Sequence, residues 1–273
     1  MKKLASIIFP LALALLMYAC TKRTGITNQP YAAYGVTATQ GQLKINLAFS
    51  YTVDYATIML KVNGQTVGSA LQTRTPFPGG GYNTRGSNYA LYLSVPVGND
   101  TVQVGIPKVG TSTDSIVFYK TVVNIPDTAH YTLHITDTLV NASTNNTKSI
   151  LVKNNINAVD TGKCRFKFVN LMPNVAAIDL YLNGILMKSN LPYLQSADTT
   201  ISTGLNAPGY SPTATTTWVV RAYPSTTASA TLASYASSNL LQYQQVLTLY
   251  AMGYSGSTGT RLPYLCGTLD KNQ

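Results

Sequence analysis

The chain has little charge and no glutamate. Only 10% of its 273 residues are charged, and all nine acidic residues are Asp. Long surface helices depend on Glu, Lys and Arg, so this composition argues against an all-α fold. A hydrophobic fraction of 45% is too high for a disordered chain. Thr and the 19 Tyr residues suit half-buried pleated surfaces, and we therefore expect an all-β fold.

Sequence motifs for catalysis, metal binding or cofactor binding are missing as well. The two histidines, His130 and His134, lie in a segment that alternates like a strand, which would separate them by about 13 Å. There is no nucleophile elbow, phosphate loop, or zinc or calcium spacing. We predict a protein without catalytic residues, metal or cofactor. A hydrolase built from Asp residues distant in sequence is the remote alternative.

The first twenty residues have the pattern of an export signal. Lys2 and Lys3 precede the apolar run Leu4–Leu16, which is too short to span a membrane. Ala19-Cys20 ends this run as in bacterial lipoproteins, which implies lipidation of Cys20 after cleavage. An ordinary signal peptide with a chance Cys is the alternative. We predict a signal peptide at 1–19, a lipidated tether at 20–30 and an outer-membrane location, with the periplasmic leaflet slightly favoured over the cell surface.

The positive charge does not indicate a nucleic-acid partner. The formal net charge of +10 becomes 17 − 9 = +8 once residues 1–19 are removed. The remaining charge is divided evenly between the two halves of the chain, whereas nucleic-acid binding concentrates it on one surface. Lys163, Arg165 and Lys167 form the one basic stripe, and we interpret it as a solvated edge strand that resists pairing. Contact with an anionic glycan is the alternative.

Two segments of the chain share one pattern. Residues 56–62 and 176–182 are alternating strands that each run into Asn-Gly, at Asn63-Gly64 and Asn183-Gly184. Asn-Gly between such strands is the strongest short signal for a β-hairpin. Matching strands flank both hairpins. We predict two immunoglobulin-like β-sandwiches, at 31–158 and 159–273, with a small barrel as the alternative architecture.

Two cysteines remain after Cys20. Cys164 lies on the first strand of the second unit and Cys266 on its last. Export places both where disulfides persist, and the alternation would point both inward. We predict a Cys164–Cys266 disulfide, with two buried free thiols as the alternative.

Binding or modification is predicted at two kinds of surface segment. The Gly-rich segment 73–88 carries Arg74, Phe77, Tyr82 and Arg85, a mixture typical of recognition loops, although a tolerated surface insertion is the alternative. Four Asp-Ser/Thr pairs followed by an aliphatic residue or Thr resemble the O-glycosylation sites of some bacterial envelopes. The candidate acceptors are Ser115, Thr128, Thr138 and Thr199.

The second unit resembles a known family. The segment 168–174 reads Phe-Val-Asn-Leu-Met-Pro-Asn, and 178–184 reads Ile-Asp-Leu-Tyr-Leu-Asn-Gly. This pattern is similar to that of domain of unknown function 4397, an Ig-like unit often found in bacterial lipoproteins. The resemblance covers most of 163–273, while the first unit resembles a degenerate copy. The resemblance implies a fold and a location, and it carries no catalytic residues.

These observations give two main hypotheses for function. The first is a non-catalytic envelope lipoprotein, a structural or protein-interaction module on the outer membrane. The alternative is a glycan-binding lipoprotein for polysaccharide uptake or adhesion, which reads sugars through Tyr side chains. Exposed, coplanar aromatic rings at one end of a sandwich would favour the second hypothesis.

Overall fold

The described part of the chain consists of β-strands. The computed structural model describes residues 39–50, 58–86, 89–108, 110–111, 113–136, 148–160, 162–202, 215–237 and 245–271. Strands and one 3-10 turn, Gly259–Arg261, are the only regular elements in these ranges, which confirms the all-β prediction. None of the described segments is a helix long and apolar enough to cross a membrane. The predicted signal peptide, Cys20 and the tether lie outside the described residues.

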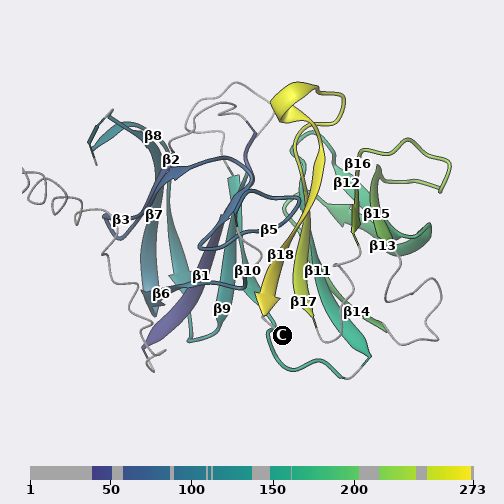
Figure 1. Ribbon diagram of the computed structural model, residues 1–273, viewed down its shortest axis with the longest axis horizontal. Coiled ribbons are helices and arrows are strands. Elements are labelled where there is room, and N and C mark those ends of the chain that lie inside the picture. Colours follow the sequence, from purple (N-terminus) through teal and green to yellow (C-terminus); the bar gives the residue numbers. More distant parts are fainter. Residues whose placement is uncertain are drawn as a thin grey trace, which may run out of the picture. The chain divides into compact units, whose positions relative to one another are not determined.

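The first half of the chain forms two sheets (Figure 1). Sheet A has the order β10-β9-β1-β4, and β6 also pairs with β1. Sheet B has the order β3-β2-β7-β8. The bounds are β1 Gln40–Leu47, β2 Ile58–Val62, β3 Gln65–Leu71, β4 Thr75–Phe77, β6 Leu93–Pro96, β7 Gly98–Pro107, β8 Asp114–Ile125, β9 His130–Thr136 and β10 Lys148–Asn154.

The second half forms two further sheets. Sheet C has the order β14-β11-β17-β18-β5, and sheet D has the order β13-β12-β15-β16. The bounds are β5 Gly81–Tyr82, β11 Lys163–Leu171, β12 Ala177–Leu182, β13 Ile185–Pro192, β14 Ser196–Ser202, β15 Thr216–Ala222, β16 Ala233–Ser237, β17 Val246–Met252 and β18 Tyr264–Lys271. Together with the first two sheets, they lie in one compact unit that spans residues 38–273.

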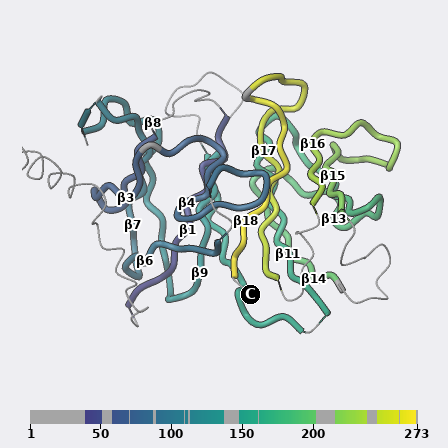
Figure 2. Tube along the Cα trace, in the orientation of Figure 1, coloured from purple at the N-terminus to yellow at the C-terminus, as the bar shows by residue number. Residues whose placement is uncertain are grey.

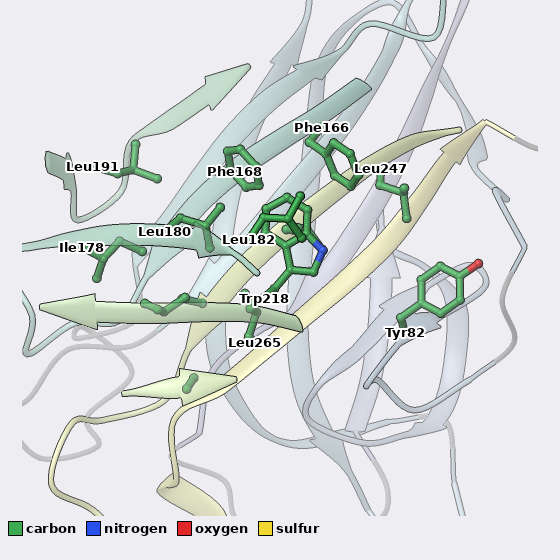
Figure 3. Close-up of a cluster of buried hydrophobic side chains, with 14 of the residues drawn as sticks. Tyr82, Phe166, Phe168, Ile178, Leu180, Leu182, Leu191, Trp218, Leu247 and Leu265 are labelled. Carbon is green, nitrogen blue, oxygen red and sulfur yellow. The ribbon is translucent and has the colours of Figure 1, made fainter. Parts of the chain in front are cut away.

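Each half is a sandwich because the apolar residues of its strands alternate. In β1, Leu43, Ile45 and Leu47 are fully buried and contribute to the core between sheets A and B. The core between sheets C and D is centred on aromatic rings (Figure 3). The ring centre of Trp218 lies 5.0 Å from that of Phe166 and 5.5 Å from that of Phe168. Both cores follow from the period of two that the sequence shows.

The two halves share the same strand pairings. β1 pairs in parallel with β9, as β11 does with β17, and the order β3-β2-β7-β8 corresponds to β13-β12-β15-β16. Even the irregularity in register recurs, at Leu60 in one hairpin and Leu180 in the other. Both hairpin turns have positive φ, 50° and 78° at Asn63-Gly64 and 49° and 81° at Asn183-Gly184, as their sequences predict.

The segment 73–86 joins the two halves. Its strand β4 pairs with β1 of sheet A, and its strand β5 pairs with β18 of sheet C, so β5 lies beside β18 in Figures 1 and 2. A Cβ on Gly81 would lie only 1.9 Å from the carbonyl oxygen of Gly267, so this close approach requires glycine. We call residues 73–86 the strap.

The four residues predicted to form a recognition loop lie in the strap, and each contacts another part of the protein. Tyr82 is buried in the core of the second sandwich, and Phe77 packs against the core of the first. The Arg74 guanidinium lies 4.1 Å from the ring centre of Tyr264, and Arg85 donates a hydrogen bond to Gln72. These contacts do not support a free recognition loop. The strap supplies a strand to each sheet, and binding by Arg74, Phe77, Tyr82 and Arg85 stays a prediction.

The predicted Cys164–Cys266 disulfide is wrong, since both thiols are free. Strand β17 lies between β11 and β18, so the two cysteines are not on neighbouring strands. They also point to opposite faces of sheet C, because Cys164 belongs to the core of the second sandwich and Cys266 to a separate cluster on the other face. Alternation on β18 sends Leu265 and Leu269 into the core and Cys266 away from it.

The basic stripe is not on an edge strand, contrary to our interpretation. Lys163, Arg165 and Lys167 lie on β11, which has β14 on one side and β17 on the other. Lys167 is buried and donates to the carboxylate of Asp198 at 2.6 and 2.8 Å. Lys167 therefore lies on a covered part of the sheet face, whereas the Lys163 side chain at the other end of the stripe is exposed to solvent.

Replacement of Gly81 tests the strap. We expect Gly81→Ala to destabilise the fold by about 1–3 kcal/mol, because its methyl group would collide with the Gly267 carbonyl and separate β5 from β18. Urea unfolding of the two proteins measures this difference. Gly110→Asn is the control, since no atom lies within 4 Å of an added Cβ there and Asn tolerates the positive φ of 74°. Equal midpoints for wild type and Gly81→Ala would contradict the pairing.

Thiol labelling tests the free cysteines. Burial raises the pKa of both Cys164 and Cys266 to about 12, so both remain neutral thiols near neutral pH. We expect iodoacetamide to label neither residue in the folded protein, and both after denaturation without reductant. Peptide mass spectrometry reads the labels. Labelling that requires prior reduction would show a disulfide instead.

Candidate functional site

The outer faces of sheets A and C meet in a buried layer rich in polar side chains. These faces are the ones directed away from the two sandwich cores. The polar layer, as we call it, comprises residues that are at least nine-tenths buried. Sheet A contributes Gln42, Lys44, Asn46, Thr132, His134, Thr136 and Asn154. Sheet C contributes Lys167, Thr248, Tyr250, Thr268 and Asp270. An apolar margin formed by Ala48, Val169, Leu171, Met252 and Cys266 continues the contact.

Lys44 and Asp270 form the centre of the polar layer. The Nζ atom of Lys44 lies 3.5 Å from Oδ1 of Asp270, and the exposed fractions of the two side chains are 0% and 1%. Lys44 also donates to the backbone carbonyl of Leu269, which brings it onto the strand that carries Asp270. The contact joins β1, the first strand of sheet A, to β18, the last strand of the chain.

Neutral donors surround the carboxyl of Asp270. Thr248 donates to Oδ2 at 2.6 Å, and Asn154 donates to Oδ1 at 3.3 Å. The Tyr92 hydroxyl lies 3.4 Å from Oδ1, and the ring of Tyr92 has Lys44 Nζ 4.5 Å from its centre. Asn154 also donates to Thr132 and Tyr92, so three residues distant in the sequence fix its position.

Burial moves the pKa values of both central groups toward their neutral forms. Desolvation lowers the pKa of Lys44, against the opposing effect of Asp270. Desolvation likewise raises the pKa of Asp270, although Lys44 and the Thr248 hydroxyl act in the other direction. In this buried site, a neutral amine beside a neutral carboxyl group therefore competes with the ion pair.

His134 occupies the same layer and is also neutral. Its Nδ1 atom lies 2.9 Å from the side-chain amide of Asn46, with which it forms a buried hydrogen bond. Desolvation, with smaller effects of Lys44 and Lys167, lowers the pKa of His134 to about 3. Both His residues lie on β9, as the alternating pattern predicts. No group of three potential metal ligands occurs among the described residues.

The polar layer can act only within the molecule. Its central side chains have no exposed surface, so an external substrate would have to separate sheets A and C to reach them. What the layer can do is fix the two sandwiches against each other, or carry out chemistry between its own groups.

The Asp and Tyr of the resembled motif have a different place. Asp179 and Tyr181 lie on the outer face of sheet D, where Asp179 accepts hydrogen bonds from Ser189 and from the backbone amides of Asn190 and Ser225, as well as from the Ser225 hydroxyl. Tyr181 donates to the Ser225 carbonyl. These bonds lower the pKa of Asp179 despite its burial. The motif residues thus hold the β15–β16 loop and offer no free carboxylate.

The predicted modification sites differ in exposure. Ser115 and Thr128 are exposed, Thr199 is half-buried, and Thr138 lies outside the described residues. Glycosylation of these residues stays a prediction. Aromatic rings for sugar stacking are few: within the described ranges, only Tyr89 and Tyr223 have exposed rings, at 62% and 45%, and the single Trp is fully buried.

Sequence reasoning missed Lys44, Asp270 and the whole polar layer. Polar residues that alternate with apolar ones on a strand normally face water, and β1 and β9 have that pattern. The one available signal was the low charge, since outer strand faces of Thr, Asn and His are compatible with burial against a second sheet.

The low pKa of His134 predicts acid sensitivity. Unfolding lets this group regain an ordinary pKa near 6.5, so its contribution is full above that pH and is lost progressively as the pH falls toward 3. We expect a loss of about 3 kcal/mol from this residue at about pH 4.5, and a smaller loss in His134→Gln. Urea unfolding of wild type and His134→Gln, at about pH 4.5 and above pH 6.5, measures how much stability each protein loses on acidification. Comparing the two losses cancels the effect of the other titrating groups. The half-buried His130, changed to Gln, is the control, and identical pH profiles for all three proteins would contradict the assignment.

Solved structures with some likeness to the chain are binding proteins. A family 41 carbohydrate-binding module from streptococcal virulence factors, described in a study of alpha-glucan recognition, is 11% identical with a TM-score of 0.24, over 82% of this chain and 96% of that chain. A family 26 module from Eubacterium rectale Amy13K, in complex with maltoheptaose, is 9% identical with a TM-score of 0.20, over 81% and 99%. A putative adhesin from Bacteroides ovatus is 10% identical with a TM-score of 0.18, over 81% and 90%. At these TM-scores the likenesses identify no ligand for this chain.

Sequence comparison supports the resemblance stated from the motifs. No curated protein matches the chain significantly. The family match begins before β2 and ends within β12, so it covers most of the first half and the start of the second, whereas we expected it over 163–273. Both halves present an alternating strand that runs into Asn-Gly. Residues 52–181 match the family described as Domain of unknown function (DUF4397).

Proposed function

We propose that the chain is a non-catalytic lipoprotein of the bacterial cell envelope that serves as a structural or protein-interaction module on the outer membrane. The observation that supports this proposal best is the polar layer. It commits the most deeply buried ionisable groups, Lys44, His134 and Asp270, to contacts between two sandwiches. Two sandwiches fixed to each other in this way suit a rigid structural or interaction module better than an enzyme.

The proposed anchor rests on the sequence. A basic start, an apolar run and Ala19-Cys20 are the marks of lipoprotein processing, and the residues after Cys20 carry no acid that would favour export to the cell surface. Stable anchoring requires two or more acyl chains, which a processed lipoprotein cysteine carries. Residues 20–30 would then separate the lipid from the sandwiches.

Carbohydrate binding is the alternative that an experiment must address. Sugar-binding sandwiches use exposed aromatic rings, and Tyr89 and Tyr223 come from different halves of the chain. A glycan array with the purified protein separates the two hypotheses. Uniformly blank arrays agree with the proposed module, and saturable binding that is lost in Tyr89→Ala or Tyr223→Ala would replace it with the alternative.

Replacement of Cys20 tests the anchor. We expect Cys20→Ala to lose labelling by a palmitate analogue and to move from the membrane pellet to the soluble fraction, because no acyl acceptor remains. Metabolic labelling followed by fractionation and gel analysis measures both effects. Thr21→Ala is the matched control and should keep label and location. Unchanged labelling in Cys20→Ala would refute the anchor.

A further inference from the structure

The contact between Lys44 and Asp270 brings together an amine and a carboxyl group, the two groups that form an amide bond. The amine nitrogen lies 3.5 Å from Oδ1 of Asp270, one bond away from the carbon that it would attack, and neither side chain is exposed. Both residues are held by strands in the interior of their sheets, β1 and β18. We infer that Lys44 and Asp270 condense within the folded protein, so that an isopeptide bond links the first strand of sheet A to the last strand of the chain.

The layer favours the reactive forms of both groups. A lysine attacks only as the free amine, and a carboxyl group accepts attack only when it is protonated, because a carboxylate repels the nucleophile. Burial drives both residues in this direction, lowering the pKa of Lys44 and raising that of Asp270. Burial lowers the pKa of His134 to about 3, so this neutral neighbour adds no negative charge that would hold Lys44 protonated.

The hydrogen-bond donors divide the two carboxyl oxygens between two roles. Thr248 donates to Oδ2, which therefore acts as the carbonyl oxygen and gains negative charge when the amine adds. Asn154 and Tyr92 lie at Oδ1, the oxygen nearest to Lys44 Nζ, which leaves as the hydroxyl. Thr248, Asn154 and Tyr92 are positioning residues in this scheme.

The reaction balances without any other reactant. The Nζ–Cγ bond forms and the Cγ–Oδ1 bond breaks. One proton of the amine passes to the departing hydroxyl, so one water molecule is released and no atom is oxidised or reduced. Fixed neighbours of this kind react with effective molarities of about 10⁵ to 10⁸ M, and exclusion of water from the layer opposes hydrolysis of the product.

The chain carries its own control for proximity alone. Lys153 and Asp127 also form an ion pair, and their separation of 2.7 Å is shorter than that of Lys44 and Asp270. Their side chains are 58% and 46% exposed, and the pKa of Lys153 is raised while that of Asp127 is lowered to about 2. Both groups are therefore charged, and this pair should remain unlinked although its atoms are closer.

Peptide mass spectrometry of the full-length protein tests the bond. Trypsin cannot cleave after a linked Lys44, so we expect a branched peptide that joins residues 24–61 to residues 262–271, with a mass one water below the sum. Lys44→Met, which keeps the volume and removes the amine, should yield only the separate peptides. The peptides that contain Lys153 and Asp127 should be unlinked in both proteins.

Two outcomes would overturn the inference. The first is recovery of the unlinked Lys44 and Asp270 peptides at full abundance from the folded wild-type protein, which needs no variant to interpret. The second is a branch from Lys44 to Asn154 with loss of ammonia, which would make the amide and not Asp270 the reacting group. Neither reading depends on Cys20 or on a glycan, so this test is independent of the proposed function.

Discussion

The contact between Lys44 and Asp270 connects the outer faces of sheets A and C at their most buried point. Around it, Asn154, Thr248 and Tyr92 satisfy the carboxyl group, while His134 and Asn46 pair with each other. Removing charged or polar groups from water is costly unless each finds a partner, so this arrangement tolerates little displacement. The relative position of sheets A and C is therefore set by polar contacts, and the apolar margin seals them.

The strap also joins the two sandwiches, through strand pairing. It gives β4 to sheet A and β5 to sheet C, and it places Tyr82 in the core of the second sandwich. Two sandwiches joined only by a linker would move independently, whereas these two are joined by the strap, by Tyr82 in the second core and by a buried polar layer. This explains why residues 38–273 form one compact unit although each half has its own core.

Local patterns in the sequence were sufficient for much of the fold. Alternation located β1, β11 and β12, and Asn-Gly located both hairpins, because these features depend on neighbours within a few residues. The alternation could not say what covers the polar face of a strand. Gln42, Lys44 and Asn46 would look the same beside water or beside another sheet, and only the tertiary structure shows that they are buried.

The disulfide prediction failed, and the strands of the strap were not predicted, for a related reason. Cys266 follows the period of two on β18, but its face was assigned from an assumed position of that strand. The strap was interpreted as a loop because Gly and Pro interrupt it, yet Gly81 is required by a close approach to Gly267, 186 positions further along the chain in the printed sequence. Partners at such separations leave no local signal.

The large sequence separation between β18 and its partners β5 and Lys44 has a consequence for how the protein folds. Sheet C has no partner for β5, and Lys44 lacks its acceptor 225 residues away, until β18 has been synthesised. Contacts this distant close slowly, because the intervening chain must be ordered before they stabilise it. A molecule that has lost its last ten residues would retain two exposed strand edges and an uncovered lysine. The pairing of β5 and the burial of Lys44 thus both depend on the one strand β18.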